Sequence, residues 1–280
     1  MQPKSCRRGR ATAHIARTDL YCGLVIVGFA NGISERIGNE IHRHGLMTAV
    51  FNTFGVSVVV WAAAVLALSL LLRAERQPAT RMDFAVAVIA SIAFLMPVPS
   101  VSWLALAGIA AYLAVTSDPP EPMRRAAVVI GAMTVPMLWA RILFAAMSNT
   151  ILEADAKLVS WIVGTRSTGN TVPFADGTGI LFLEPGCSSL TNLSLAVLCG
   201  VLFVKGYNRR WSAAIVRTIV LACAATIIIN VVRIGTIGIF PDYYDVIHGQ
   251  VGATLAEWIT LMAVIAIFTE GIKPDAQARA

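Results

Sequence analysis

The sequence predicts an all-α membrane protein, a polytopic helical bundle of about eight spans. Of its 280 residues, 57% are hydrophobic and only 14% are charged, whereas about a quarter of the residues of a soluble domain are charged. Several apolar runs approach the ~20 residues that a helix needs to cross the core of a bilayer. The predicted spans are residues 19–33, 50–72, 83–97, 101–116, 126–148, 188–205, 213–239 and 251–269.

The basic residues between these spans predict the orientation. With both termini in the cytoplasm, 15 of the 22 lysines and arginines lie on the cytoplasmic side and only four lie outside. Cytoplasmic loops are enriched in lysine and arginine. We therefore expect a multi-pass protein of the bacterial inner (plasma) membrane, with its active site facing the periplasm or exterior. The net charge of +6 then reflects topology, and we expect no binding of nucleic acid.

The order of the spans divides the chain into five parts. They are a basic cytoplasmic tail (1–18), an N-terminal helical bundle (19–148), an extracytoplasmic loop (149–187), a catalytic three-helix segment (188–270) and a second cytoplasmic tail (271–280).

The extracytoplasmic loop carries two signals of local structure. Apolar residues at near-helical spacing over 149–165 predict an amphipathic helix at the membrane interface. Two short apolar runs around Asp176-Gly177 predict a small β-hairpin before the cysteine, with an ordinary loop as the alternative. Such a hairpin would lead directly to Cys187 and form a lid or wall over its thiol.

Cys187 differs from the other four cysteines in its position. Cys22, Cys199 and Cys223 lie within predicted spans, where a thiol is usually a small packing residue, and Cys6 lies in the basic tail. Cys187 follows Pro185-Gly186 and precedes Ser188 and Ser189, either of which is a natural N-cap. A thiol at a helix N-terminus meets the positive end of the helix dipole, which favours the nucleophilic thiolate. No cysteine pair has metal-ligand spacing, and we expect neither a metal nor an organic cofactor.

Two further polar residues are predicted at the same membrane face as Cys187. Arg233 lies about 9 Å inside the outer end of the seventh span at 1.5 Å per residue, and a charge at such a depth is a candidate for function. His248 precedes the eighth span. A thiol, an imidazole and a guanidinium at one depth can act as nucleophile, proton carrier and oxyanion stabiliser.

Four residues, Arg141, Glu184, Asn230 and Ser188, are predicted to support this site or to bind substrate. Asn230, one turn before Arg233, could orient it. Arg141, a second arginine within a span, could hold Glu184 or a substrate carboxylate, or could be structural. Ser188 is a candidate cap for the helix that follows the thiol.

Three motifs resemble the exosortase/archaeosortase family of membrane-embedded cysteine transpeptidases. They are "EPGCSSL", "NVVRIGTIG" and "HGQVG" preceded by "YYDVI". Relatives commonly have Ser-Gly after the cysteine, where this chain has Ser188-Ser189. The resemblance implies that Cys187, Arg233 and His248 are catalytic. It implies substrates that are secreted proteins with a C-terminal motif, a transmembrane helix and a basic tail.

These expectations together describe a transpeptidase that sorts proteins to the cell surface. It would cleave a C-terminal sorting signal through a thioacyl intermediate and transfer the protein to an unknown amine acceptor, working among membrane lipids. One alternative is an intramembrane cysteine protease, a hydrolase that uses water as the acceptor. The other is a transporter or polysaccharide-export component without enzymatic activity, in which Arg141 and Arg233 line a polar pathway.

Overall fold

The computed structural model describes residues 15–116 and 121–272, which form ten α-helices and one two-stranded sheet. The helices are α1 (Arg17–Phe51), α2 (Val58–Arg73), α3 (Arg81–Leu95), α4 (Pro99–Val115), α5 (Glu121–Thr134), α6 (Ala140–Val163), α7 (Ser189–Gly206), α8 (Ala213–Ile239), α9 (Tyr244–His248) and α10 (Gln250–Gly271). Strands β1 (Thr171–Pro173) and β2 (Ile180–Phe182) lie between α6 and α7. The predicted all-α membrane bundle is confirmed. Most of the two predicted tails, residues 1–14 and 273–280, and with them Cys6, fall outside the described residues.

The predicted number of spans is wrong. Within the described residues, five helical stretches are long and apolar enough to cross a membrane: Arg17–Phe51, Pro122–Val163, Pro185–Gly206, Ala213–Ile239 and Val251–Gly271. Helices α2, α3 and α4 have 16, 15 and 17 residues, about 23–26 Å at 1.5 Å per residue, which is less than the ~30 Å of a bilayer core. The predicted span 50–72 begins too early, because Thr53, Phe54 and Gly55 adopt positive φ angles that break the helix.

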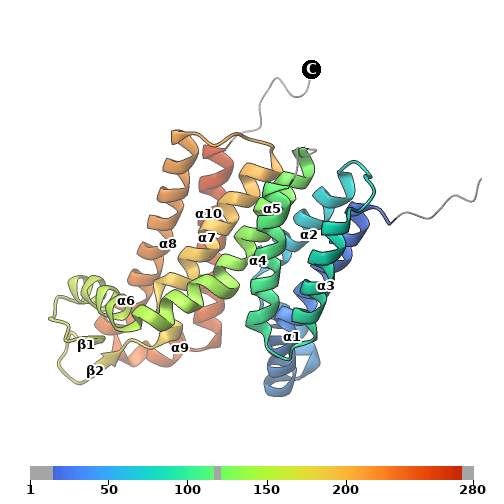
Figure 1. The fold of residues 1–280 in the computed structure, drawn as a ribbon. Helices are drawn as coiled ribbons and strands as arrows, with labels where there is room; N and C mark the ends of the chain where they lie inside the picture. The colour runs from blue at the N-terminus through green and yellow to red at the C-terminus, as the bar shows by residue number, and fades with distance from the viewer. Residues whose placement is uncertain (1–14, 117–120, 273–280) are drawn as a thin grey trace, which may run out of the picture.

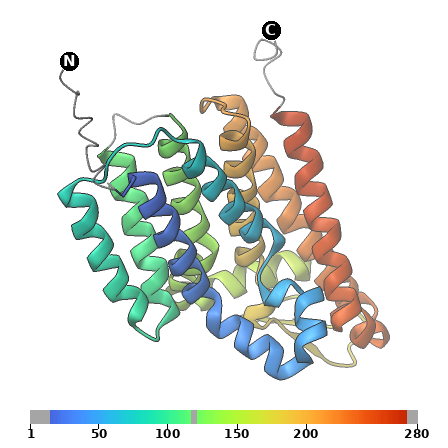
Figure 2. The same ribbon diagram turned by 90° about the vertical axis from the view of Figure 1, so that its right-hand side faces the viewer.

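The bundle has two distinct ends. The start of α1 and the end of α10 lie at one end (Figure 2), and the β-hairpin and α9 lie at the other (Figure 1). This arrangement agrees with a topology in which both tails lie on one side of the membrane and the candidate site on the other. Many apolar side chains on the outer faces of the helices are exposed, among them Val65, Ile228 and Met262, as expected of surfaces that face lipid.

Capping residues set where several helices begin. The Ser57 side chain accepts a hydrogen bond at the start of α2, and Ser212 does the same for α8. Thr80 and Asp83 form a reciprocal capping box at the start of α3, which satisfies two otherwise unpaired backbone N–H groups. Pro99 occupies the first turn of α4, where its missing N–H costs nothing.

A π-helical turn, Val135–Trp139, joins α5 to α6. Pro136 lies within it, and a proline cannot donate the usual backbone hydrogen bond, so the helix widens and bends there. Beyond the turn α6 leaves the direction of α5 and packs on α7 and α8 at the hairpin end of the bundle (Figure 1). Helix α6 includes the predicted amphipathic helix 149–165 up to Val163 and ends at Gly164, whose φ of 79° is left-handed.

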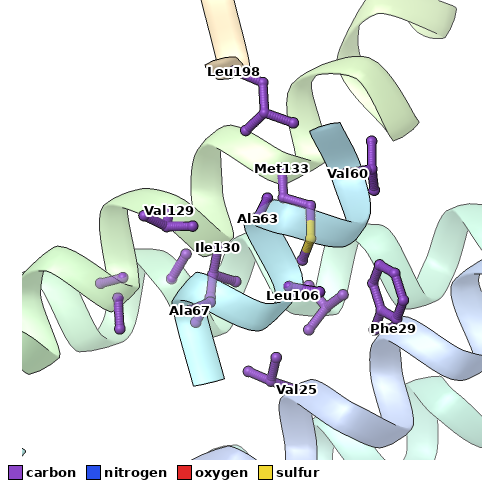
Figure 3. Close-up of a cluster of buried hydrophobic side chains, with 14 of the residues drawn as sticks. Val25, Phe29, Val60, Ala63, Ala67, Leu106, Val129, Ile130, Met133 and Leu198 are labelled. Atoms are coloured by element: carbon purple, nitrogen blue, oxygen red, sulfur yellow. The ribbon is translucent and has the colours of Figure 1, made fainter. Parts of the chain in front are cut away.

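Two hydrophobic clusters hold the molecule together. The larger one joins α1, α2, α4, α5 and α7, and Figure 3 shows Phe29, Ala63, Leu106 and Met133 pointing toward one another within it. The smaller one joins α6, the two strands and α8, and Cys187 packs against its edge. The candidate site therefore rests on its own apolar base, separate from the main core.

A buried polar network fixes the start of α1 against α3. Arg17 Nε donates to Asp83 Oδ1 at 2.8 Å, and the Tyr21 hydroxyl donates to the same oxygen at 2.8 Å. The other carboxylate oxygen, Oδ2, accepts bonds from the backbone N–H and the hydroxyl of Thr80. Because Asp83 is fully buried, its charge is tolerated only through these partners.

Replacing Asp83 with alanine is expected to lower the free energy of unfolding by about 3–5 kcal/mol, because the Arg17 charge is left buried without its partner. Unfolding in detergent micelles measures this difference. Asp19→Ala is the matched control: Asp19 pairs with Arg76 through side chains that are 49% and 77% exposed, and such pairs contribute less than about 1 kcal/mol. Equal losses in the two variants would contradict a stabilising role of the network.

Candidate active site

The thiol of Cys187 stands at the entrance to α7. Residues Pro185–Cys187 form one 3₁₀ turn, closed by a hydrogen bond from the Cys187 N–H to the Glu184 carbonyl at 2.9 Å. Helix α7 begins at Ser189, and the Ser188 hydroxyl caps it by accepting from the Leu190 N–H at 3.2 Å. The predicted position of Cys187 before a serine-capped helix is thus confirmed, and its side chain is half-buried.

The predicted hairpin exists and forms one wall of the site. Strands β1 and β2 are antiparallel, with Val172 opposite Leu181, and both of these side chains are buried against the smaller cluster. The turn contains Asp176 and Gly177, whose φ is 73°. The backbone N–H and hydroxyl of Thr178 donate to Asp176 and hold the pKa of that carboxyl below its ordinary value.

Asn230 holds the chain just after the thiol, through one backbone and one side-chain acceptor. Its Nδ2 donates to the Cys187 carbonyl at 2.8 Å and to the Ser189 hydroxyl at 3.1 Å. The predicted orientation of Arg233 by Asn230 stays a prediction, because a guanidinium only donates and would need the Asn230 Oδ1, whereas these two contacts use Nδ2. Since both side-chain N–H groups of an asparagine amide are on one nitrogen, Asn230 is used here to fix the turn that carries Cys187.

His248 is the contact partner of the thiol. Its Nε2 lies 3.8 Å from Cys187 Sγ, a long contact of the kind that tightens when substrate binds. The imidazole stacks on the Tyr244 ring, with centroids 4.9 Å apart and planes 9° from parallel. The short helix α9 carries both rings one turn apart, so the tyrosine sets the plane in which the imidazole faces the sulfur.

Arg233 links α8 to the histidine-bearing helix. Its Nε and Nη2 donate to the Ile247 carbonyl at 3.4 and 3.3 Å, and Ile247 directly precedes His248. The half-buried guanidinium also lines the same pocket as the thiol and the imidazole. The three predicted catalytic residues therefore come together, as their equal depth in the last three spans predicted.

The pocket between these residues is small. Its lining consists of Leu181, Phe182, Leu183, Glu184, Cys187, Arg233, Ile234, Ile237, Tyr244 and His248. The cavity volume is about 20 Å³, which is room for about one water molecule. A peptide has to reach the thiol by displacing part of this lining, and two of the lining residues belong to the hairpin strand β2.

Two supporting residues of the prediction do not meet. Glu184 lies on the rim of the pocket and is exposed, as is Arg141. Within the described part of the chain the ion pairs are Arg17–Asp83, Arg76–Asp19 and Lys157–Glu153, so Arg141 does not hold Glu184. Arg141 instead lies near enough to Arg36 of α1 for electrostatic repulsion.

Two acidic residues near the site escaped the sequence analysis. Glu257 on α10 lies near enough to Arg233 for electrostatic attraction, and its place within an apolar span was a usable signal. Asp155 on α6 accepts a hydrogen bond from the Ser189 N–H at 3.0 Å and is only 5% exposed. Its spacing from Leu152 and Val159, three and four residues away, places it on the apolar face of the helix.

The chemistry open to this arrangement follows from the three converging groups. A neutral imidazole can accept the thiol proton and generate a thiolate. A guanidinium can stabilise the negative charge that develops on a carbonyl oxygen under attack. Helix α7 begins two residues after Cys187, and the positive end of its dipole also favours the thiolate.

The family model described as transmembrane exosortase (Exosortase_EpsH) matches residues 29–269 of this chain. The matched range begins within α1 and ends within α10, so it includes the hairpin and Cys187, Arg233 and His248. No curated protein and no solved structure matches the chain.

Proposed function

Because this chain belongs to the transmembrane exosortase family, we propose that it is a cysteine transpeptidase that cleaves a C-terminal sorting signal of secreted proteins and transfers them to an acceptor. One observation carries the proposal. Cys187, Arg233 and His248 line a single pocket, with the sulfur 3.8 Å from the imidazole nitrogen.

Acylation begins when the Cys187 thiol gives its proton to His248 Nε2. The thiolate then attacks the scissile carbonyl carbon, and Arg233 stabilises the oxyanion of the tetrahedral intermediate. When this intermediate collapses, the C–N bond breaks and the departing amine takes the proton from His248. A thioester between Cys187 and the substrate remains, and the tail that carries the sorting signal is released.

The second half of the reaction restores the enzyme. An amine-bearing acceptor attacks the thioester carbon, His248 takes the proton from the attacking amine, and Arg233 stabilises the second oxyanion. As the C–S bond breaks, the proton passes to the sulfur. The product is the secreted protein joined by an amide bond to the acceptor.

The geometry of the site favours a cysteine transpeptidase over a transporter. A transporter has no use for a thiol that contacts an imidazole beside a capped helix N-terminus, whereas nucleophilic catalysis requires such a contact. Hydrolysis by the same residues remains the competing function, since water can replace the amine. We propose that the reaction takes place at the outer face of the inner membrane, in accord with the lysine and arginine count.

The nature of the acceptor decides between transfer and hydrolysis. When the protein in membranes is incubated with a secreted substrate and hydroxylamine, the thioester is expected to be captured as a hydroxamate at the new C-terminus. Mass spectrometry of the product without hydroxylamine should show the mass of an added amine component. A product that ends only in a free carboxylate, with or without acceptor-containing membranes, would make the protein a cysteine protease.

A further inference from the structure

Asp155 is a buried carboxylate that takes no part in the reaction steps proposed above. It lies in α6, about one turn from Leu152 and Val159 of the smaller hydrophobic cluster, and is 5% exposed. None of the ion pairs formed by the described residues includes it. A carboxylate in such surroundings costs several kcal/mol unless its hydrogen bonds compensate, which makes it a candidate for a specific role.

The hydrogen-bond partner of Asp155 points to that role. Asp155 Oδ2 accepts from the Ser189 N–H at 3.0 Å, and Ser189 is the first residue of α7, two residues after Cys187. The cap of α7 is already supplied by the Ser188 hydroxyl, which accepts from Leu190. Asp155 thus adds a bond from another helix to an amide just beyond the thiol.

A second helix, α8, holds the same turn through a hydrogen bond of the opposite direction. Asn230 of α8 donates to the Cys187 carbonyl at 2.8 Å, while Asp155 of α6 accepts from the Ser189 amide. The backbone from Cys187 to Ser189 is therefore fixed by one donor and one acceptor that come from two different helices. The position of the sulfur relative to His248 depends on this clamp, because Cys187 belongs to the turn whose backbone the two helices hold.

We infer that Asp155 is a positioning residue, which fixes the Cys187 turn so that the thiol faces His248. This inference rests on the proposed function of Cys187. Asp155 does not line the pocket and touches no reacting atom, so it acts through the backbone of α7. A misplacement of reacting atoms by about 1 Å can lower a rate on the order of a hundredfold, and such a displacement is the expected consequence of losing this bond.

The test compares variants of the full-length protein in which Cys6, Cys22, Cys199 and Cys223 are replaced by alanine. In this background iodoacetamide reports the reactivity of Cys187 alone. Asp155→Leu removes the acceptor and should slow alkylation at neutral pH by about tenfold to a hundredfold, since the thiol loses its base. Asp155→Asn keeps an acceptor oxygen and should stay within a few-fold of the parent. Glu153→Gln on the exposed face of α6 should have no effect.

A pair of variants at Ser189 tests the same bond from the donor side. Ser189→Pro removes the N–H at the first position of a helix, where proline is tolerated, and should slow alkylation as much as Asp155→Leu. Ser189→Ala keeps the N–H and should alkylate nearly at the parental rate. This pair remains informative if Asp155→Leu does not fold.

Processing of a secreted substrate gives the second readout. Asp155→Leu should lower kcat, while KM stays within about twofold of the parental value, because the residues that line the pocket are unchanged. Parental alkylation rates in both Asp155→Leu and Ser189→Pro, with only a lower melting temperature, would overturn the inference and leave Asp155 a structural cap. If substrate processing does not depend on Cys187, the proposed function fails, yet the alkylation rates still decide whether Asp155 positions the thiol.

Discussion

Replacing Cys187 with alanine is expected to abolish processing of the substrate. The loss should be on the order of a thousandfold or more, as for other enzymes that lose their nucleophile, because no other side chain in the pocket can form the acyl intermediate. Gel mobility of a secreted protein with a C-terminal apolar helix, expressed together with each variant, measures tail removal directly.

Cys199→Ala is the matched control for this substitution. Cys199 is a free cysteine on α7, the helix that follows Cys187, and it is buried in the larger hydrophobic cluster. We expect the Cys199→Ala variant to process the substrate as fully as the parent does. Unchanged processing in Cys187→Ala would contradict the thioacyl mechanism. In that case Arg141 and Arg233 should be examined as parts of a transport pathway.

Arg233→Ala is expected to lower kcat by about a hundredfold to a thousandfold, the range measured when a single oxyanion donor is removed. Arg233→Lys should recover part of this loss, since a lysine restores the charge without the planar fork of donors. Steady-state kinetics with a purified substrate in detergent or nanodiscs separate this effect on kcat from any effect on KM.

Arg217→Ala provides the comparison within the same helix. Arg217 lies near the start of α8, far along the helix from the pocket, and its Nε donates to the Ala213 carbonyl at 3.4 Å. Kinetic constants of this variant should equal those of the parent. A rise in KM with unchanged kcat in Arg233→Ala would instead assign the guanidinium to substrate binding.

The candidate site could be predicted from the sequence because depth in a membrane is nearly a one-dimensional quantity. Counting residues at 1.5 Å each from the ends of apolar runs placed Cys187, Arg233 and His248 at one level before any packing was known. The Pro-Gly-Cys-Ser-Ser order in the same way predicted a helix that begins just after the thiol, since proline and serine signal local backbone structure.

The errors arose where local signals compete with packing. The span 50–72 was extended through Thr53 and Phe54, because apolar composition conceals a turn of positive φ. The contacts of Asn230 were missed, because its amide donates to Cys187 and Ser189, more than 40 positions earlier in the chain. Asp155 was missed, because no local pattern shows that packing buries it beside Ser189.

The sequence by itself therefore determined the class of the protein, the positions of most of its helices, the hairpin and the three polar residues at one membrane face. These follow from composition, from periodicity and from residues with strong backbone preferences, all of which act over a few positions. Only the tertiary structure decided which helices adjoin, and hence that α6 and α8 clamp the Cys187 turn while α9 brings His248 to the sulfur. Contacts of this kind depend on the fit of whole helix faces, which no local pattern encodes.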